Sequence, residues 1–113
     1  MRINEIELYE KSITGNKEGI GVVVSCTDLY EFENGKKTDK QIGFVLETVM
    51  PDNRYNKEKI KVVNTNPVVT NELIAQQGGT VKVKFKNLRG KFYRTPSGEY
   101  LLSCKADGVE VMA

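Results

Sequence analysis

The sequence predicts an all-β protein, a five-stranded Greek-key barrel with one short helix between the third and fourth strands. Between residues 18 and 111, five segments place β-branched, aromatic and other apolar residues at alternate positions, the pattern of strands buried on one face. One helical segment interrupts them, after the third strand. At 113 residues the chain has the size of one domain, so we expect residues 1–113 to share a single core.

The first barrel strand is predicted at residues 18–32, where β-branched and aromatic residues follow one another. Before it, residues 5–8 alternate glutamate with Ile6 and Leu8, which indicates a short peripheral strand, and residues 14–17 have the composition of a turn. The inward-facing side chains expected in the first barrel strand are Ile20, Val22, Val24 and Cys26.

Asn34-Gly35 follows this strand and predicts a tight hairpin, because both central positions of a type I′ turn need a positive φ. The second strand is expected at residues 41–50, and Pro51 ends it because proline has no N–H to donate to a sheet. The third strand is expected at residues 59–64. Its alternation points Ile60 and Val62 inward and Lys59 and Lys61 outward.

A short helix is predicted at residues 71–77, because Gly78-Gly79 can adopt the left-handed conformation that ends a helix. The fourth strand, residues 80–86, alternates apolar residues with lysines and is the clearest half-buried strand of the chain. The fifth strand is expected at residues 99–106, with a continuation to residue 111. Residues 87–98 are expected to extend these two strands as a hairpin tipped by Pro-Ser-Gly.

The composition disfavours several kinds of function. The chain has no histidine, which is the usual general base at neutral pH and the commonest metal ligand. Two cysteines alone cannot form a tetrahedral zinc site, and no phosphate-binding loop or nucleophile motif occurs. We therefore expect no enzymatic activity, no catalytic residue, no metal and no cofactor.

The sequence also carries expectations about location. No apolar run approaches the ~20 residues that cross a bilayer, and the first residues lack the apolar stretch of a secretory signal. We therefore expect a cytoplasmic protein without a membrane partner. Cys26 and Cys104 lie in apolar strand patterns, so we expect them to be buried and reduced rather than joined in a disulfide.

The charges are distributed unevenly along the chain. The formal net charge of +2 is too small to indicate a polyanionic partner. However, residues 1–35 hold three basic and seven acidic side chains, whereas residues 80–113 hold seven basic and three acidic ones. One region of the folded protein is therefore expected to be strongly basic.

Residues 89–94, Arg-Gly-Lys-Phe-Tyr-Arg, carry the sharpest functional prediction. Binding a single strand without sequence choice needs cations along the phosphates and flat side chains on which bases stack. The expected phosphate contacts are Arg89, Lys91 and Arg94, and the expected stacking residues are Phe92 and Tyr93. The alternative is a solubilised hairpin in which Phe92 packs on the core.

Further members of the predicted nucleic-acid site lie earlier in the chain. They are Lys36 and Lys37 beside the hairpin turn, Tyr55 in the loop after the second strand, and Lys59 and Lys61 on the third strand. Taken alone, the two hairpin lysines are typical of a solvated turn, and Tyr55 could instead cap the barrel. The lysines of the fourth strand, Lys82, Lys84 and Lys86, are expected to protect an edge strand rather than to follow a phosphate chain.

The order of the predicted elements resembles the OB-fold, a small barrel whose second and third strands and two loops commonly bind oligonucleotides or oligosaccharides. Residues 79–88, the basic turn after them and residues 100–102 resemble a strand pair of the filamentous-phage gene V single-stranded DNA-binding proteins. Residues 35–37 are similar to the DNA-binding wing of that family. The resemblance implies a homodimer that coats single-stranded DNA cooperatively, with Tyr55, Phe92 and Tyr93 stacking on bases.

The expected function is binding of single-stranded nucleic acid, DNA rather than RNA, during replication or transfer of a phage, plasmid or other mobile element. Two alternatives stay open. One is a protein-interaction module of a phage or mobile element, in which the basic hairpin meets an acidic protein surface. The other is an oligosaccharide-binding domain, which the absence of tryptophan and the many cations disfavour.

Overall fold

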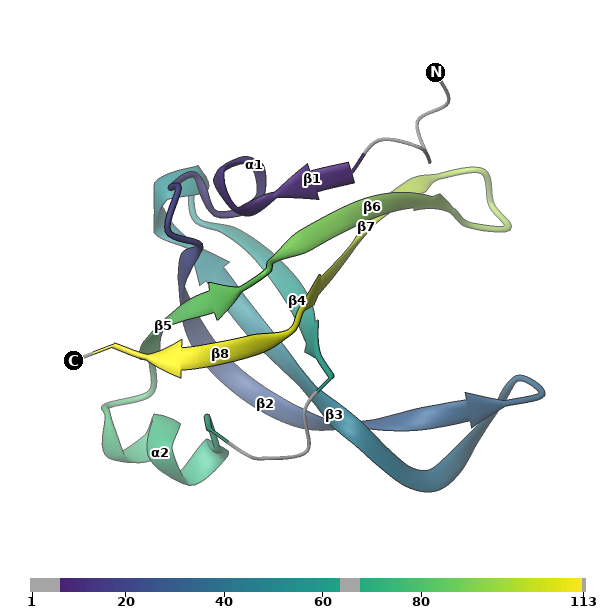
Figure 1. Ribbon diagram of the computed structural model, residues 1–113, viewed down its shortest axis with the longest axis horizontal. Helices are drawn as coiled ribbons and strands as arrows, with labels where there is room; N and C mark the ends of the chain where they lie inside the picture. The colour runs from purple at the N-terminus through teal and green to yellow at the C-terminus, as the bar shows by residue number, and fades with distance from the viewer. Residues whose placement is uncertain (1–6, 64–67, 113) are drawn as a thin grey trace.

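The protein is all-β, as the sequence predicts. The computed structural model describes residues 7–63 and 68–112, and within these ranges eight strands form one sheet, in the order β1-β6-β7-β4-β3-β2-β5-β8 (Figure 1). The strands are β1 (Glu7–Tyr9), β2 (Ile20–Glu33), β3 (Lys36–Met50), β4 (Asn56–Val62), β5 (Val81–Lys86), β6 (Arg89–Arg94), β7 (Tyr100–Ala106) and β8 (Gly108–Val111). The predicted five-stranded closed barrel is wrong in strand number and in closure, because this hydrogen-bonded order has two ends.

Two bends in the chain explain why the prediction of five strands fails. The predicted fourth strand is β5, and after Asn87 and Leu88 the chain continues as β6. The predicted fifth strand is interrupted at Asp107, which separates β7 from β8. β5 pairs with β8 at one end of the sheet, whereas β6 pairs with β7 towards the other end. Each long segment therefore serves both halves of a curled sheet, which surrounds the core without a continuous closed ladder (Figure 1).

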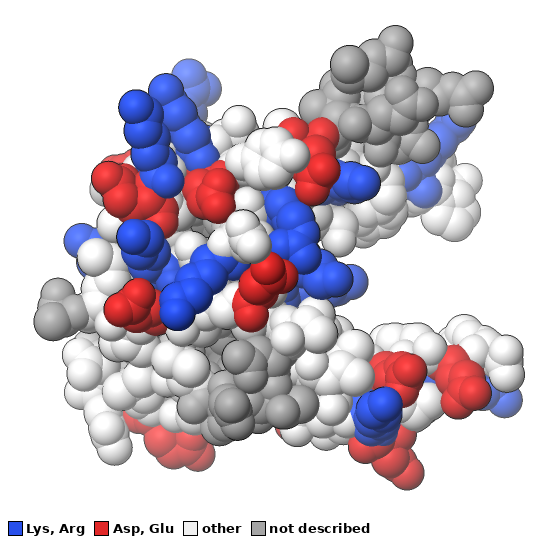
Figure 2. Space-filling model, viewed as in Figure 1, with Lys and Arg blue, Asp and Glu red and all other residues white. Residues whose placement is uncertain are grey.

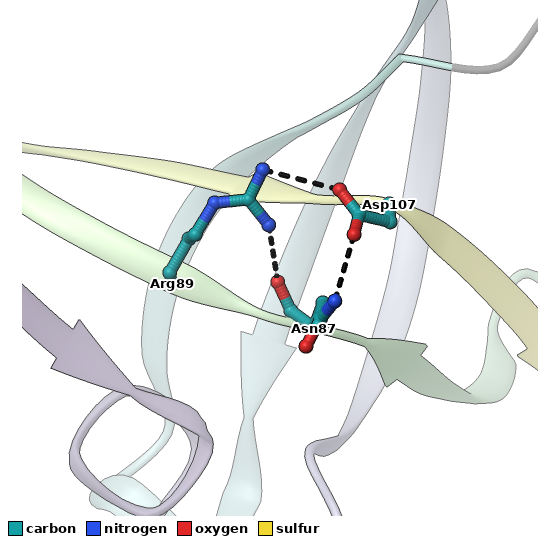
Figure 3. A network of polar contacts seen from close by, with 3 residues as sticks. All are labelled: Asn87, Arg89 and Asp107. Atoms are coloured by element: carbon teal, nitrogen blue, oxygen red, sulfur yellow. Dashed lines mark hydrogen bonds and ion pairs between the residues drawn. The ribbon is translucent and has the colours of Figure 1, made fainter.

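A ring of polar contacts joins the two bends (Figure 3). Arg89 donates a hydrogen bond to the backbone carbonyl of Asn87 at 2.8 Å and forms an ion pair with Asp107 at 3.1 Å. The Asn87 amide donates to the second carboxylate oxygen of Asp107 at 2.8 Å. These hydrogen bonds, from Asn87 and then from Arg89, lower the pKa of Asp107 and keep its carboxylate charged. Asn87 has a φ of 54°, a left-handed conformation that asparagine adopts more readily than most residues.

The first half of β2 buries the opposite face from the predicted one. Val23 is fully buried, whereas Ile20 and Val22 are only partly covered. A register shift just after Val23 then returns Cys26 to the core. Because one extra residue exchanges the two faces of a strand, this β-bulge accounts for the error.

The predicted helix is confirmed as α2 (Asn71–Gln76), which lies between β4 and β5 in the chain and packs on β2. Thr70 caps it by accepting a hydrogen bond from the N–H of Leu73 at 3.1 Å. Asn71 accepts from the N–H of Cys26 at 3.0 Å and donates to its carbonyl at 2.9 Å. β2 pairs with β5 only as far as Val23, so the N–H and C=O of Cys26 are hydrogen-bonded by the helix residue Asn71 instead. In the described part of the chain, no helix has the length and apolar character needed to cross a membrane.

The predicted inward and outward faces of the third and fourth strands are confirmed. β4 exposes Lys59 and Lys61 and buries the apolar residues that alternate with them, although its predicted end at Asn64 lies outside the described residues. β5 buries its three apolar residues and exposes its three lysines. Cys26 and Cys104 are free and buried, as expected, and burial raises the pKa of Cys104 to about 12. A thiol that stays neutral in this way behaves as a small apolar side chain.

The N-terminal segment contains a helix that the sequence pattern did not predict. β1 leads directly into α1 (Glu10–Thr14), and the predicted turn begins where this helix ends, at Gly15 with a φ of 85°. α1 packs against the 3₁₀ helix η2 (Pro51–Asn53) and buries Ile13. In Figure 1, α1 lies above the curled sheet and α2 lies below it. Residues 5–6, part of the predicted peripheral strand, lie outside the described residues.

Gly43→Ala tests the close approach of β3 to β4. A Cβ at Gly43 would overlap the carbonyl oxygen of Val62, and both belong to backbones that are held in the sheet. We expect the free energy of unfolding, measured by urea denaturation, to fall by about 3 kcal/mol. Gly108→Ala is the matched control, because its nearest neighbour is the flexible Lys86 side chain at 3.5 Å, and it should cost less than about 1 kcal/mol. Equal losses in both variants would contradict the close approach.

Asp107→Asn tests the polar ring at the two bends. We expect a lower midpoint of thermal unfolding at pH 7, because the variant loses the ion pair with Arg89. A carboxyl whose pKa is lowered by folding stabilises the protein above its unfolded pKa, near 3.8, and ceases to do so as the pH falls through the folded value. The difference between wild type and variant should therefore shrink as the pH is lowered from 7 towards 2. Glu99→Gln, an exposed site in the hairpin loop, should show no comparable difference at pH 7.

Candidate nucleic-acid interface

Two hairpin arms project from the same side of the molecule (Figure 1), and the space-filling view shows a hollow between them (Figure 2). One arm is the β2–β3 hairpin, whose turn at Asn34-Gly35 has φ angles of 53° and 77°, as the sequence predicts. The other arm is the β6–β7 hairpin, which ends in the loop of residues 95–99. The predicted basic segments thus lie on two separate arms. Lys36 and Lys37 stand at the turn of the first arm, whereas residues 89–94 form strand β6 of the second, whose loop at residues 95–99 holds no lysine or arginine.

Five cations from three neighbouring strands lie on the outward face of the sheet, and we call them the cationic face. They are Lys59 and Lys61 of β4, Lys105 of β7, and Arg89 and Lys91 of β6. The parallel pairing of β4 with β7 sets Lys61 opposite Lys105, and the pairing of β7 with β6 sets Lys105 opposite Arg89. All five point away from the core, because the residues that alternate with them face inward.

Three neighbouring depressions lie along the cationic face. One of about 440 Å³ lies between β4 and the β6–β7 arm, one of about 340 Å³ lies over β2, β3 and β4, and one of about 250 Å³ lies over β1, β6 and β7. The first and second share Lys59 and Lys61, and the first and third share Ser103. These shared residues place the three depressions beside one another over six strands of the sheet, and we call them together the track. Each depression is lined by cations and by one glutamate, which is Glu7, Glu47 or Glu58.

Some of the cations on this surface already have acidic partners. Lys57 forms an ion pair with Glu47 at 3.1 Å, and its hydrogen bond lowers the pKa of that carboxyl. Arg89 is held by Asp107 in the ring described above. The other four members of the cationic face are Lys59, Lys61, Lys91 and Lys105. Among the described residues, no carboxylate oxygen lies within 4.0 Å of their side-chain nitrogens. Lys91 stands opposite Glu7 of β1 and Lys59 opposite Glu47 of β3, so Lys61 and Lys105 are the members with no acidic residue opposite them in these strand pairs.

Tyr93 stands beside these lysines, whereas Phe92 and Arg94 do not. Tyr93 lines the largest depression, opposite Leu101 on β7, and the two side chains are 48% and 44% exposed. Because side chains alternate along a strand, Phe92 and Arg94 point to the other face of the arm. Phe92 is partly buried opposite Leu102, a residue that packs on the core. The structure thus divides the predicted cluster 89–94 between two faces.

The β2–β3 arm is not a basic wing. Residues 27–41 hold three lysines but four acidic side chains. Lys37 lies over the ring of Tyr30 at 4.5 Å, and Lys40 forms an ion pair with Glu31 at 3.8 Å. Lys36 is exposed at the turn. The predicted phosphate contacts Lys36 and Lys37 therefore lie on an arm of mixed charge, away from the lysines of the cationic face.

Tyr55 lies at a third place, in the turn between β3 and β4. Its φ of 58° gives it a left-handed backbone, and its side chain is 74% exposed. It does not line any of the three depressions described above. Tyr55 therefore caps nothing in the described structure, and it is separate from Tyr93 and the track.

Lys105 is the member of the cationic face that sequence reasoning missed. It belongs to the predicted fifth strand, where Cys104 and Ala106 are buried. The alternation of these two small apolar residues with Ser103 and Lys105 was a usable signal for an outward lysine. What the pattern could not indicate is that β7 lies beside β4, since a parallel neighbour is chosen by the fold.

The described residues contain no cluster of three or more His, Cys, Asp or Glu side chains that could hold a metal ion. Comparison with known proteins found no match to this chain among family models, curated sequences or solved structures.

Proposed function

We propose that the protein binds single-stranded nucleic acid, with DNA as the first candidate, along the cationic face. The observation that carries this proposal is the row of lysines on β4, β7 and β6 beside the exposed ring of Tyr93, because none of these lysines forms an ion pair with another described residue. Neighbouring strands lie roughly 4.8 Å apart, so cations on successive strands offer closely spaced contacts to a flexible phosphate chain. Tyr93 supplies the flat surface on which a base can stack.

The strand connectivity supports this proposal. β2, β3, β4, α2, the bent segment β5–β6 and the bent segment β7–β8 follow one another in the element order of an OB-fold, with β4 and β7 parallel. We interpret the protein as an OB-like sheet whose fourth and fifth strands are each broken by a bend. In that fold the second and third strands form the ligand platform, and these correspond to β3 and β4 here. Lys59 and Lys61 then stand where an oligonucleotide would lie.

Each member of the proposed site has a defined role. Lys59, Lys61, Lys91 and Lys105 contact phosphates, and Tyr93 stacks on a base. Arg89 holds the fold through Asp107 and contributes charge from that position. Lys36, Lys37 and Arg94 lie farther along the arms and would meet only a longer strand, while Phe92 and Tyr55 stay outside the core of the site. A homodimer, and a role in replication or transfer of a phage or plasmid, rest on the family resemblance alone.

Titration of fluorescent oligo-dT tests the proposal directly. We expect measurable affinity at low salt and a steep loss of affinity at higher salt, because every phosphate contact releases condensed counterions. Competition with duplex DNA and with oligo-U on the same sample shows which of the three nucleic acids binds most tightly. Unmeasurable affinity for oligo-dT at low salt would overturn the proposal.

The double variant Lys61→Gln/Lys105→Gln tests the location of the site. Removing two phosphate contacts should weaken oligo-dT binding and reduce the slope of log affinity against log salt by roughly one to two. The matched control is Lys82→Gln/Lys84→Gln, which makes the same change in charge on exposed positions of β5. If the control lowers the slope as much as the test variant, the nucleic acid lies elsewhere on the protein or binds by net charge only.

Tyr93→Ala tests base stacking separately from charge. The variant should lose about 1–3 kcal/mol of oligo-dT affinity, since that is the usual worth of one stacked base, while the salt slope stays unchanged. Tyr100→Ala is a close control, because Tyr100 lies on the same arm, is 47% exposed against 48% for Tyr93, and points to the opposite face. Equal effects of the two substitutions would contradict a specific stacking role for Tyr93.

A further inference from the structure

The sheet splits between β4 and β7. These strands pair only where Ile60–Val62 of β4 meet residues 104–106 of β7. β3 pairs with the whole length of β4, and β6 pairs with β7 from Tyr100 to Lys105. Among the described residues, no strand pairs with the facing edges of residues 56–59 on β4 and residues 100–103 on β7. We call the gap between these two edges the fork.

The fork is an open groove rather than a filled contact. Its two edges supply most of the lining of the depression of about 440 Å³. A strand edge presents unpaired N–H donors and C=O acceptors in alternation, and such an edge is a ready template for another extended chain. A phosphate backbone can satisfy the donors but has no N–H to offer the carbonyls. The main-chain chemistry of the fork therefore suits a peptide better than a polynucleotide.

The side chains around the fork differ between its two faces. On the outward face, Lys57, Lys59 and Lys61 flank the groove on one side, and Tyr93 and Leu101 flank it on the other. The inward face is lined by Leu102 and by Glu58, whose carboxylate accepts a hydrogen bond from Asn56 at 3.1 Å. Glu58 is thus the one carboxylate in this lining, against three lysines.

We propose that the fork binds an extended acidic peptide by strand addition. The peptide backbone pairs with the open edge of β7, its outward side chains are acidic and meet the lysines of β4, and its inward side chains are apolar and meet Leu102. Main-chain hydrogen bonds supply affinity in this mode and alternate side chains supply specificity. The open edges are four residues long on each strand, which matches about 13 Å of extended chain.

Another free edge makes a useful comparison. β8 is the last strand of the sheet, so its outer edge is also unpaired among the described residues. That edge has Glu110 opposite Lys84 and is not part of the three depressions described above. The fork differs because two edges and a cationic lining converge there. Peptide binding at the fork does not depend on the proposed binding of nucleic acid, although the two ligands share Lys59, Lys61 and Tyr93.

Fluorescence anisotropy with synthetic peptides tests this proposal on the full chain. The probe is a labelled eight-residue peptide that alternates aspartate with valine, and a lysine–valine peptide of the same length is its charge control. We expect saturable binding of the aspartate peptide and at least tenfold weaker binding of the lysine peptide. Equal binding of both peptides, or no saturable binding of the aspartate peptide, would overturn the proposal.

Two N-methylated forms of the aspartate peptide separate strand addition from simple charge attraction. One form is methylated at every odd residue and the other at every even residue, so each lacks the N–H groups of one peptide edge. We expect one form to bind at least tenfold more weakly than the other, because only one edge faces β7. Equal affinities of both forms and of the parent peptide would show that no strand pairs.

Amide hydrogen exchange locates the peptide. Protection should rise in residues 100–103 of β7 and stay unchanged in residues 108–111 of β8. Protection confined to β8 would overturn the assignment to the fork. Oligo-dT titration of the same sample keeps the two proposals apart: binding of DNA without peptide contradicts only the fork, and binding of peptide without DNA contradicts only the nucleic-acid proposal.

Discussion

The constraint on which the arrangement of the sheet depends is the pair of bends after β5 and after β7, which the ring of Asn87, Arg89 and Asp107 joins (Figure 3). The ring holds together two long segments, 81–94 and 100–111, at the point where each turns from one half of the sheet to the other. With these bends in place, β5 can pair with β2 while β6, two residues further on, pairs with β7. Arg89 is therefore better understood as a residue that positions the β6–β7 arm than as a freely available phosphate contact.

The position of that arm creates both proposed binding surfaces. Because β7 runs parallel to β4 over only three residue pairs, Lys105 comes to lie beside Lys61 and the remaining edges diverge. The row of lysines and the fork are thus two consequences of one short parallel pairing. The β2–β3 arm contributes differently, since its acidic residues and the contacts of Lys37 and Lys40 leave it with mixed charge.

The alternation of apolar and polar residues predicted correctly which face of a strand is buried, except where one extra residue shifted the register. β4 and β5 have uninterrupted alternation, and their buried and exposed faces agree with the prediction. In β2 the bulge after Val23 exchanged the faces, because a period of two has no tolerance for an inserted residue. α1 escaped prediction because five residues are too few to show a helical period, and its stability comes from packing Ile13 into the core.

The sequence by itself determined that the chain is all-β, that a helix separates β4 from β5, and that Lys59 and Lys61 face outward with Tyr93 among nearby cations. These properties depend on residues that are close together in the sequence. The alternation of side chains and the residue types at turns are therefore enough to predict them. The tertiary structure alone decided that the described residues form eight strands in an open order, and that Lys105 lies beside Lys61. Such outcomes depend on which distant strands pair and in which register, and that choice is made by packing of the whole core.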